Sequence, residues 1–170
     1  MKKDLAIIGG LFLLIIFLII FGGPLTSLGF ISGQKSILDQ PKKSPEVNVS
    51  IKSLSVKATV ADTAALRKKG LSKIQSLPFD QAMLFVFENN GKYSIWMKDM
   101  KFAIDIIWLD ENKRITDIAT EVASESGKKD SELTIYKPVN DAKYVLEVNA
   151  GLVKLNNLQV GDKANFELSK

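Results

Sequence analysis

Two patterns of apolar residues divide the chain. Residues 5–23 are apolar on every face of a helix, and no charged residue occurs between Asp4 and Lys35. From residue 48 onward, apolar and polar residues alternate in short runs, which is typical of β-strands with one buried face. The pattern therefore predicts one apolar helix followed by a β-rich domain.

The apolar helix has the length of a membrane span. The nineteen residues of 5–23, at about 1.5 Å per residue, cover roughly 28 Å, close to the thickness of a bilayer core. Two lysines follow Met1, and the positive-inside rule places them in the cytoplasm. We therefore expect residues 1–4 to be a cytoplasmic tip and residues 5–23 to be a signal-anchor in the lipid bilayer.

This placement predicts a single-pass protein of the cell membrane with an extracytoplasmic C-terminal domain. The alternative is secretion after cleavage of a signal peptide near Ser27 or Ser32. Residues 5–21 are longer than the usual apolar region of a signal peptide, and an Ala-x-Ala site is missing, so we favour the anchor. Residues 24–47 contain three Pro and two Gly and are predicted to form a linker.

Residues 48–170 are predicted to form one β-rich domain. Asp62-Thr63 can cap a short helix that ends near Gly70, and Asn89-Asn90-Gly91 is a strong hairpin signal. The expected strands cover residues 49–51, 54–60, 82–88, 92–98, 102–109, 114–122, 144–149 and 163–168, with a helical turn at 151–155. This pattern predicts an α+β fold, mostly antiparallel β and barrel-like, with one or two short helices.

Composition and charge narrow the chemistry. The chain has no His and no Cys, which excludes disulfides, thiol nucleophiles, His-based triads and imidazole or thiolate metal sites. The net charge is +4, but residues 50–170 contain 18 basic and 16 acidic residues without an aromatic stripe between them. We therefore expect no nucleic-acid partner.

Trp96 and Lys98 are the first candidate site residues. Side chains on a strand alternate between its faces, so Trp96 and Lys98 point the same way from residues 92–98. They can line a pocket in which the ammonium binds an anion. The alternative is a Trp at the edge of the domain beside an ordinary solvated Lys.

Asp105 is a second candidate, because apolar residues flank it on both faces of its predicted strand. Burial of an unpaired carboxylate is costly, so Asp105 needs a partner. Lys98, Arg67 and the backbone amides of residues 98–101 are the candidates. Asp105 is then either a general base or ligand-binding acid, or a carboxylate that ties down that turn.

Two further acids complete the set of candidates. Glu147 lies on the less apolar face of the strand 144–149, where it is either at the rim of a cleft or in solvent. Asp99 and Asp105 lie six residues apart across a turn, which is far from a defined metal motif. We predict no metal site and no cofactor.

Several motifs resemble those of the bacterial and archaeal domain of unknown function number 192. The most specific is Trp96-Met97-Lys98-Asp99-Met100 followed by Asp105-Ile106. The others are Val60-Ala61-Asp62-Thr63, Arg67 with Lys69-Gly70-Leu71, Leu77-Pro78, Met83-Leu84-Phe85-Val86-Phe87, Tyr144-Val145-Leu146-Glu147-Val148, Gly151 and Gly161-Asp162. The resemblance covers about residues 50–168 and implies a compact β-rich domain, often exported or membrane-anchored, without an assigned reaction. The family usually has Asn at the position of Asp99.

These observations favour a membrane-anchored binding module for a small polar, carbohydrate-like or peptide ligand. The alternatives are a hydrolase or lyase that uses Asp105 and Lys98, and a structural or assembly factor of the cell envelope. Without His or Cys, binding is favoured over catalysis. The predicted site consists of Trp96, Lys98, Asp99, Asp105, Arg67 and Glu147. The sequence leaves the oligomeric state and the ligand's identity open.

Overall fold

The computed structural model describes residues 44–168, which contain strands, two short α-helices and one 3-10 helix. The elements are β1 Glu46–Ile51, β2 Leu54–Ala61, α2 Ala64–Lys69, β3 Gln81–Gly91, β4 Ile95–Trp96, β5 Ile104–Leu109, β6 Ile115–Val122, η2 Asp130–Glu132, β7 Ile135–Tyr136, β8 Ala142–Asn149 and α3 Leu152–Leu155. Most of them lie within a residue or two of their predicted positions.

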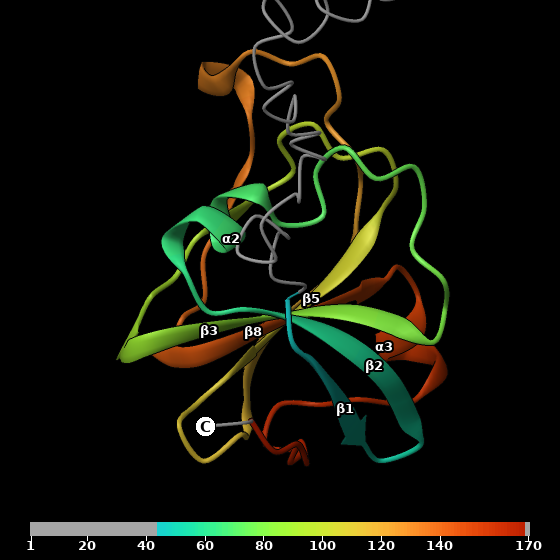
Figure 1. Cartoon of the computed structure of the whole chain (residues 1–170), viewed down its shortest axis with the longest axis vertical. Helices are drawn as coiled ribbons and strands as arrows, with labels where there is room; N and C mark the ends of the chain where they lie inside the picture. The colour runs from blue at the N-terminus through green and yellow to red at the C-terminus, as the bar shows by residue number, and fades with distance from the viewer. Residues whose placement is uncertain (1–43, 169–170) are drawn as a thin grey trace, which may run out of the picture. The chain divides into compact units, whose positions relative to one another are not determined.

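Six strands form one twisted sheet in the order β1-β2-β3-β8-β5-β6 (Figure 1). Strands β2 and β3 are parallel, and the other neighbours in this sheet are antiparallel. A parallel pair needs a crossover connection, which α2 and the loop after it supply. Strands β4 and β7 pair in a small separate sheet. The predicted α+β fold, mostly antiparallel with two short helices, is confirmed.

The main sheet is covered by apolar side chains on both faces. All six residues of the central strand β5 are buried. Ile107 and Leu109 belong to the hydrophobic cluster that includes α3, whereas Ile104, Ile106 and Trp108 belong to the cluster against which Leu66 of α2 packs. Apolar residues therefore flank Asp105 on both faces of its strand, as predicted, and the two clusters place α2 and α3 on opposite faces of the sheet.

A tight turn joins β1 and β2, and the first helix forms as the sequence predicts. Lys52 has a positive φ of 51° in the tight turn between β1 and β2. The hydroxyl of Thr63 accepts the backbone N–H of Leu66 at 3.2 Å and caps α2. Gly70, with φ of 47°, ends the helix. These local signals set the position of α2, which carries part of the candidate site.

The expected closure into a barrel is wrong for the described part of the chain. The outer strands of the main sheet, β1 and β6, are not hydrogen-bonded neighbours. The last predicted strand, residues 163–168, makes only isolated bridges, one to Ser50 and one to Arg114. Ala164 and Phe166 are buried in the core. The alternation that suggested a strand therefore belongs to a tail that covers the core between the two edges.

The predicted hairpin at Asn89-Asn90-Gly91 is also wrong. Strand β3 continues through Gly91, which pairs with Ala142 of β8, so the chain does not turn back at Asn89-Asn90. The following residues pair with β7 instead, Ile95 with Tyr136 and Trp96 with Ile135. As a result, Trp96 lies outside the main sheet.

Among residues 44–168, no helix is both long enough and apolar enough to cross a membrane. The predicted transmembrane helix, residues 5–23, lies outside the described residues.

Candidate functional site

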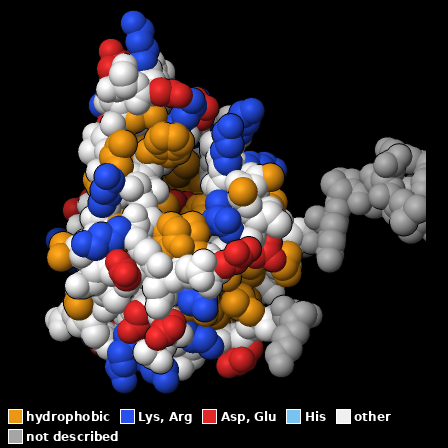
Figure 2. Space-filling model, turned by 90° about the vertical axis from the view of Figure 1, so that its left-hand side faces the viewer, with side chains coloured by type: hydrophobic (Ala, Val, Ile, Leu, Met, Phe, Trp, Pro, Cys, Tyr) orange, Lys and Arg blue, Asp and Glu red, His pale blue; other side chains and the backbone are white. Residues whose placement is uncertain are grey.

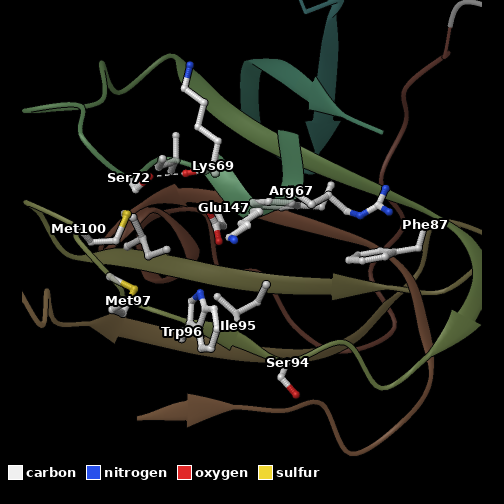
Figure 3. Close-up of a pocket in the computed structure, with 15 residues that line it drawn as sticks. Arg67, Lys69, Ser72, Phe87, Ser94, Ile95, Trp96, Met97, Met100 and Glu147 are labelled. Carbon is white, nitrogen blue, oxygen red and sulfur yellow. Dashed lines mark hydrogen bonds between the residues drawn. The ribbon is translucent and has the colours of Figure 1, made fainter. Parts of the chain in front are cut away.

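A cavity of about 240 Å³ lies between α2, β4 and one face of the main sheet (Figure 3). Figure 2 shows a face of the molecule with a hollow between hydrophobic side chains, and with Lys and Arg side chains around it. The residues that line the cavity are Arg67, Lys68, Lys69, Gly70, Leu71, Ser72, Phe85, Phe87, Ser94, Ile95, Trp96, Met97, Met100, Ile104 and Glu147. Of these, Glu147 is the only acid.

Glu147 lies on the central strand β8 between Met83 of β3 and Ile106 of β5. Its side chain is 5% exposed and has no hydrogen bond or ion pair with the described residues. Every fully enclosed side-chain nitrogen or oxygen of these residues has a hydrogen-bond partner. The unpaired carboxyl group of Glu147 must therefore reach the cavity, into which Figure 3 shows it pointing. Of the two positions that the sequence left open, the solvated strand face is wrong, since Glu147 is buried and lines a cavity.

Burial controls the protonation of this carboxyl group. Desolvation raises the pKa of Glu147 to about 8, because no cation or hydrogen-bond donor compensates for the loss of water around the charged form. At neutral pH Glu147 is therefore mainly protonated. A neutral carboxyl group both donates and accepts hydrogen bonds, so it suits a ligand hydroxyl or amide.

Arg67 lines the same cavity but does not pair with Glu147. Its Nη1 donates to the backbone oxygens of Asp62 at 2.6 Å and Val86 at 2.8 Å. Its guanidinium carbon lies 4.9 Å from the centre of the Phe87 ring, which is a cation–π distance. In Figure 3 the Arg67 side chain extends toward Phe87 and away from Glu147. Arg67 thus anchors α2 to β3 and adds positive charge to the wall.

Trp96 supplies an exposed aromatic surface at the cavity. Its side chain is 49% exposed, whereas Ile95 and Met97 on either side are buried. This confirms the predicted alternation of these side chains. An indole face of this kind can stack on an apolar ring face of a ligand.

Lys98 and Asp99 lie beside Trp96, outside the cavity that contains Glu147. Lys98 Nζ forms an ion pair with Asp130 at 2.6 Å, and that hydrogen bond raises the pKa of Lys98. Asp99 is exposed and has a left-handed backbone with φ of 57°. Asn and Asp tolerate this conformation better than other non-glycine residues, which gives a backbone reason for the family's usual Asn at this position.

Asp105 is not part of the cavity. It is 0% exposed, and its two oxygens accept the backbone N–H groups of Glu121 at 2.7 Å and Val153 at 2.9 Å. The partners expected from the sequence, Lys98, Arg67 and the amides of residues 98–101, are therefore wrong. The geometry gives Asp105 a structural role.

The local backbone explains why a carboxyl group is needed at position 105. Between the pairs Ile104–Val122 and Ile106–Ala119, strand β6 has one residue more than β5, which makes a β-bulge. Glu121 lies in this bulge with φ of 53°, and Asp105 accepts its N–H. The other oxygen accepts an N–H of the first turn of α3, whose N-cap, Gly151, has no side chain to do so.

The structure thus brings three of the predicted residues, Arg67, Trp96 and Glu147, to one cavity. Sequence reasoning missed Lys68, Lys69 and Ser72 of α2 and the loop after it, and the buried pair Met97 and Met100. The run Arg67-Lys68-Lys69 was a visible signal for the basic wall. In the described residues, acidic side chains do not gather into a group of three or more that could hold a metal ion.

Solved structures with the same fold come from bacteria. A candidate transcription regulator from Sinorhizobium meliloti superposes with a TM-score of 0.63 at 24% identity, over 71% of this chain and 92% of that one. A protein of unknown function from Novosphingobium aromaticivorans gives a TM-score of 0.61 at 24% identity, over 71% of this chain and 83% of that one. At this identity the likeness concerns the fold alone.

Sequence relatives come from archaea. A UPF0127 protein of Thermococcus gammatolerans is 31% identical over 113 residues, and one of Thermococcus kodakarensis is 31% identical over 108 residues. The match covers 65% and 62% of this chain, and 67% and 62% of those proteins. Residues 47–166 match the family DUF192, described as "Uncharacterized ACR, COG1430". This chain therefore belongs to the DUF192 family, as its motifs suggested.

Proposed function

We propose that this domain is a binding module whose cavity takes a small polar ligand with one apolar ring face. The observation that carries the proposal is Glu147, a buried carboxyl group that has no partner among the described residues and opens into a cavity. Buried polar groups of folded proteins are normally hydrogen-bonded. A ligand hydroxyl or amide would supply the missing partner.

The shape and lining of the cavity favour a ligand of about one ring. Its volume of about 240 Å³ is slightly below the roughly 300–1,000 Å³ usual for small-molecule pockets. Trp96 offers a stacking face, and Ser72 and Ser94 add hydroxyl groups to an otherwise largely apolar wall. A sugar ring, or one or two residues of a peptide, matches this combination.

A ligand screen tests the proposal. The domain has two tryptophans, Trp96 at 49% exposure and Trp108 at 1%, so a ligand in the cavity should change the emission of Trp96 alone. Envelope sugars and short peptides would be screened by tryptophan fluorescence, and each hit measured by calorimetry. We expect Trp96→Ala to weaken binding at least tenfold, or about 1.4 kcal/mol, because it removes the stacking face.

Phe79→Ala is the matched control, since Phe79 is an exposed aromatic residue that does not line the cavity. It should leave the dissociation constant within a factor of two. A ligand that binds Trp96→Ala and Glu147→Ala as tightly as the parent protein would exclude this cavity as its site.

Each alternative function loses its main support. A hydrolase or lyase based on Asp105 and Lys98 needs both side chains at one substrate, but Asp105 is enclosed with both oxygens bonded to backbone N–H groups. Lys98 is engaged with Asp130. An assembly factor acts through contacts between protein surfaces and needs no lined cavity, so the cavity favours ligand binding.

The membrane placement is a second part of the proposal. The apolar run of residues 5–23 and the lysines before it support a single-pass anchor with the described domain outside the cytoplasm. N-terminal sequencing of the full chain from isolated membranes should find a start before residue 5. A mature start after residue 22 would mean that the segment is a cleaved signal peptide.

A further inference from the structure

A second hollow adjoins the Glu147 cavity at Trp96, which lines both. It has a volume of about 380 Å³ and shares Lys68, Lys69, Ser72 and Trp96 with the first. It adds Ala65, Lys73, Lys98 and Asp99. We call this second hollow the basic groove. A ligand that stacks on Trp96 in the Glu147 cavity can extend into it.

Positive charge is concentrated in these two hollows. Five cations line them, Arg67, Lys68, Lys69, Lys73 and Lys98, but only two acids, Asp99 and Glu147. Residues 50–170 as a whole are nearly balanced, with 18 basic and 16 acidic residues. Basic residues therefore outnumber acidic residues by three around these hollows and by two in residues 50–170.

Three of these cations are available to a ligand. Lys98 is paired with Asp130, and the Nη1 of Arg67 is bonded to two backbone oxygens. The ammonium groups of Lys68, Lys69 and Lys73 make no ion pair or hydrogen bond within the described residues, and these side chains are exposed. A hollow with low-polarity walls and charges of one sign concentrates ligands of the opposite charge.

We infer that the ligand is an acidic saccharide, a sugar ring that bears a carboxylate, sulfate or phosphate group. Its ring would stack on Trp96, a hydroxyl would bond to Glu147, and its acidic group would lie in the basic groove near Lys68, Lys69 and Lys73. This inference rests on the proposed function and narrows its ligand class. Lysine ammonium groups bind such anions as point charges.

Matched sugars test the inference. The full chain in detergent would be titrated with glucose, glucuronate and glucosamine, and with galactose and galacturonate, at 0.05 M and 0.5 M NaCl. For at least one of the two pairs of sugars, we expect the acidic sugar to bind at least tenfold more tightly than the neutral sugar. Glucosamine should bind most weakly. Since screening weakens charge attraction, the advantage of the acid should shrink at high salt.

Charge variants locate the effect. The double variant Lys68→Gln with Lys73→Gln should reduce the advantage of the acidic sugar to threefold or less. The control, Lys154→Gln with Lys163→Gln, should leave it unchanged because those exposed lysines lie outside both hollows.

Equal affinity for acidic and neutral sugars would overturn this inference and leave the proposed function intact. If no sugar and no peptide of the wider panel binds, both fail. Binding to phosphatidylglycerol vesicles alone, lost in the Lys68 and Lys73 variant, would also overturn it in favour of a lipid surface.

Discussion

Replacement of Asp105 by alanine is expected to lower the free energy of unfolding by about 4 kcal/mol. The change strands the backbone N–H groups of Glu121 and Val153, and each buried unpaired donor costs roughly 1–3 kcal/mol. For a domain of this size the melting temperature should fall by on the order of 15 °C. Urea unfolding followed by circular dichroism measures the change.

Asp117→Ala is the matched control for this prediction. The two oxygens of Asp117 also accept two backbone N–H groups, those of Ile118 and Val139, but the residue is only partly buried. Water can replace those bonds, so its loss should cost about 1 kcal/mol. Asp105→Asn keeps one acceptor oxygen, so its loss of stability should lie between those of Asp105→Ala and Asp117→Ala. It provides a measurable variant if Asp105→Ala does not fold. Equal losses for Asp105→Ala and Asp117→Ala would contradict the structural role.

Glu147→Gln is expected to change how stability depends on pH. Burial raises the pKa of Glu147 to about 8, whereas the unfolded chain has an ordinary glutamate. Between about pH 5 and pH 8 the folded protein therefore binds the extra proton, and its stability falls as the pH rises. Across this window, the free energy of unfolding of the parent protein should fall by on the order of 3 kcal/mol more than that of Glu147→Gln.

The comparison uses urea unfolding of both proteins at each pH unit from 5 to 8. Hydrogen bonds from Lys128 and Lys52 lower the pKa of Glu125 and Asp162, but these groups are present in both proteins and cancel in the difference. Glu88→Gln, which removes an exposed carboxyl group of β3, controls for the change in net charge. If the difference in the free energy of unfolding between the parent and Glu147→Gln were the same at every pH, Glu147 would be ionised or solvated in the folded protein.

Local signals in the sequence predicted much of the fold. The apolar residues around Asp105 predicted a strand buried on both faces, and Thr63 and Gly70 marked the ends of α2. Long-range pairing was less predictable. The signal at Asn89-Asn90-Gly91 is a local turn preference, and it could not reveal that Gly91 pairs with Ala142 of the distant strand β8.

The same limit applies to the candidate site. The sequence showed that Asp105 would be enclosed by apolar neighbours, but its partners Glu121 and Val153 are 16 and 48 residues away. The strand that contains Glu147 has one apolar face and one mixed face, and Glu147 lies on the mixed face. Its burial follows from Met83 and Ile106 on the two neighbouring strands, which only the register of the sheet brings beside it.

The most direct test of the site is a titration of the Glu147 carboxyl carbon by NMR, with Glu147→Gln to assign the signal. In the free protein the midpoint should lie near pH 8, as the burial of the group dictates. A ligand that fills the cavity should move the midpoint higher, because it excludes water and bonds to the neutral form. A midpoint between about pH 4 and 5, unmoved by every ligand that binds the domain, would contradict the account.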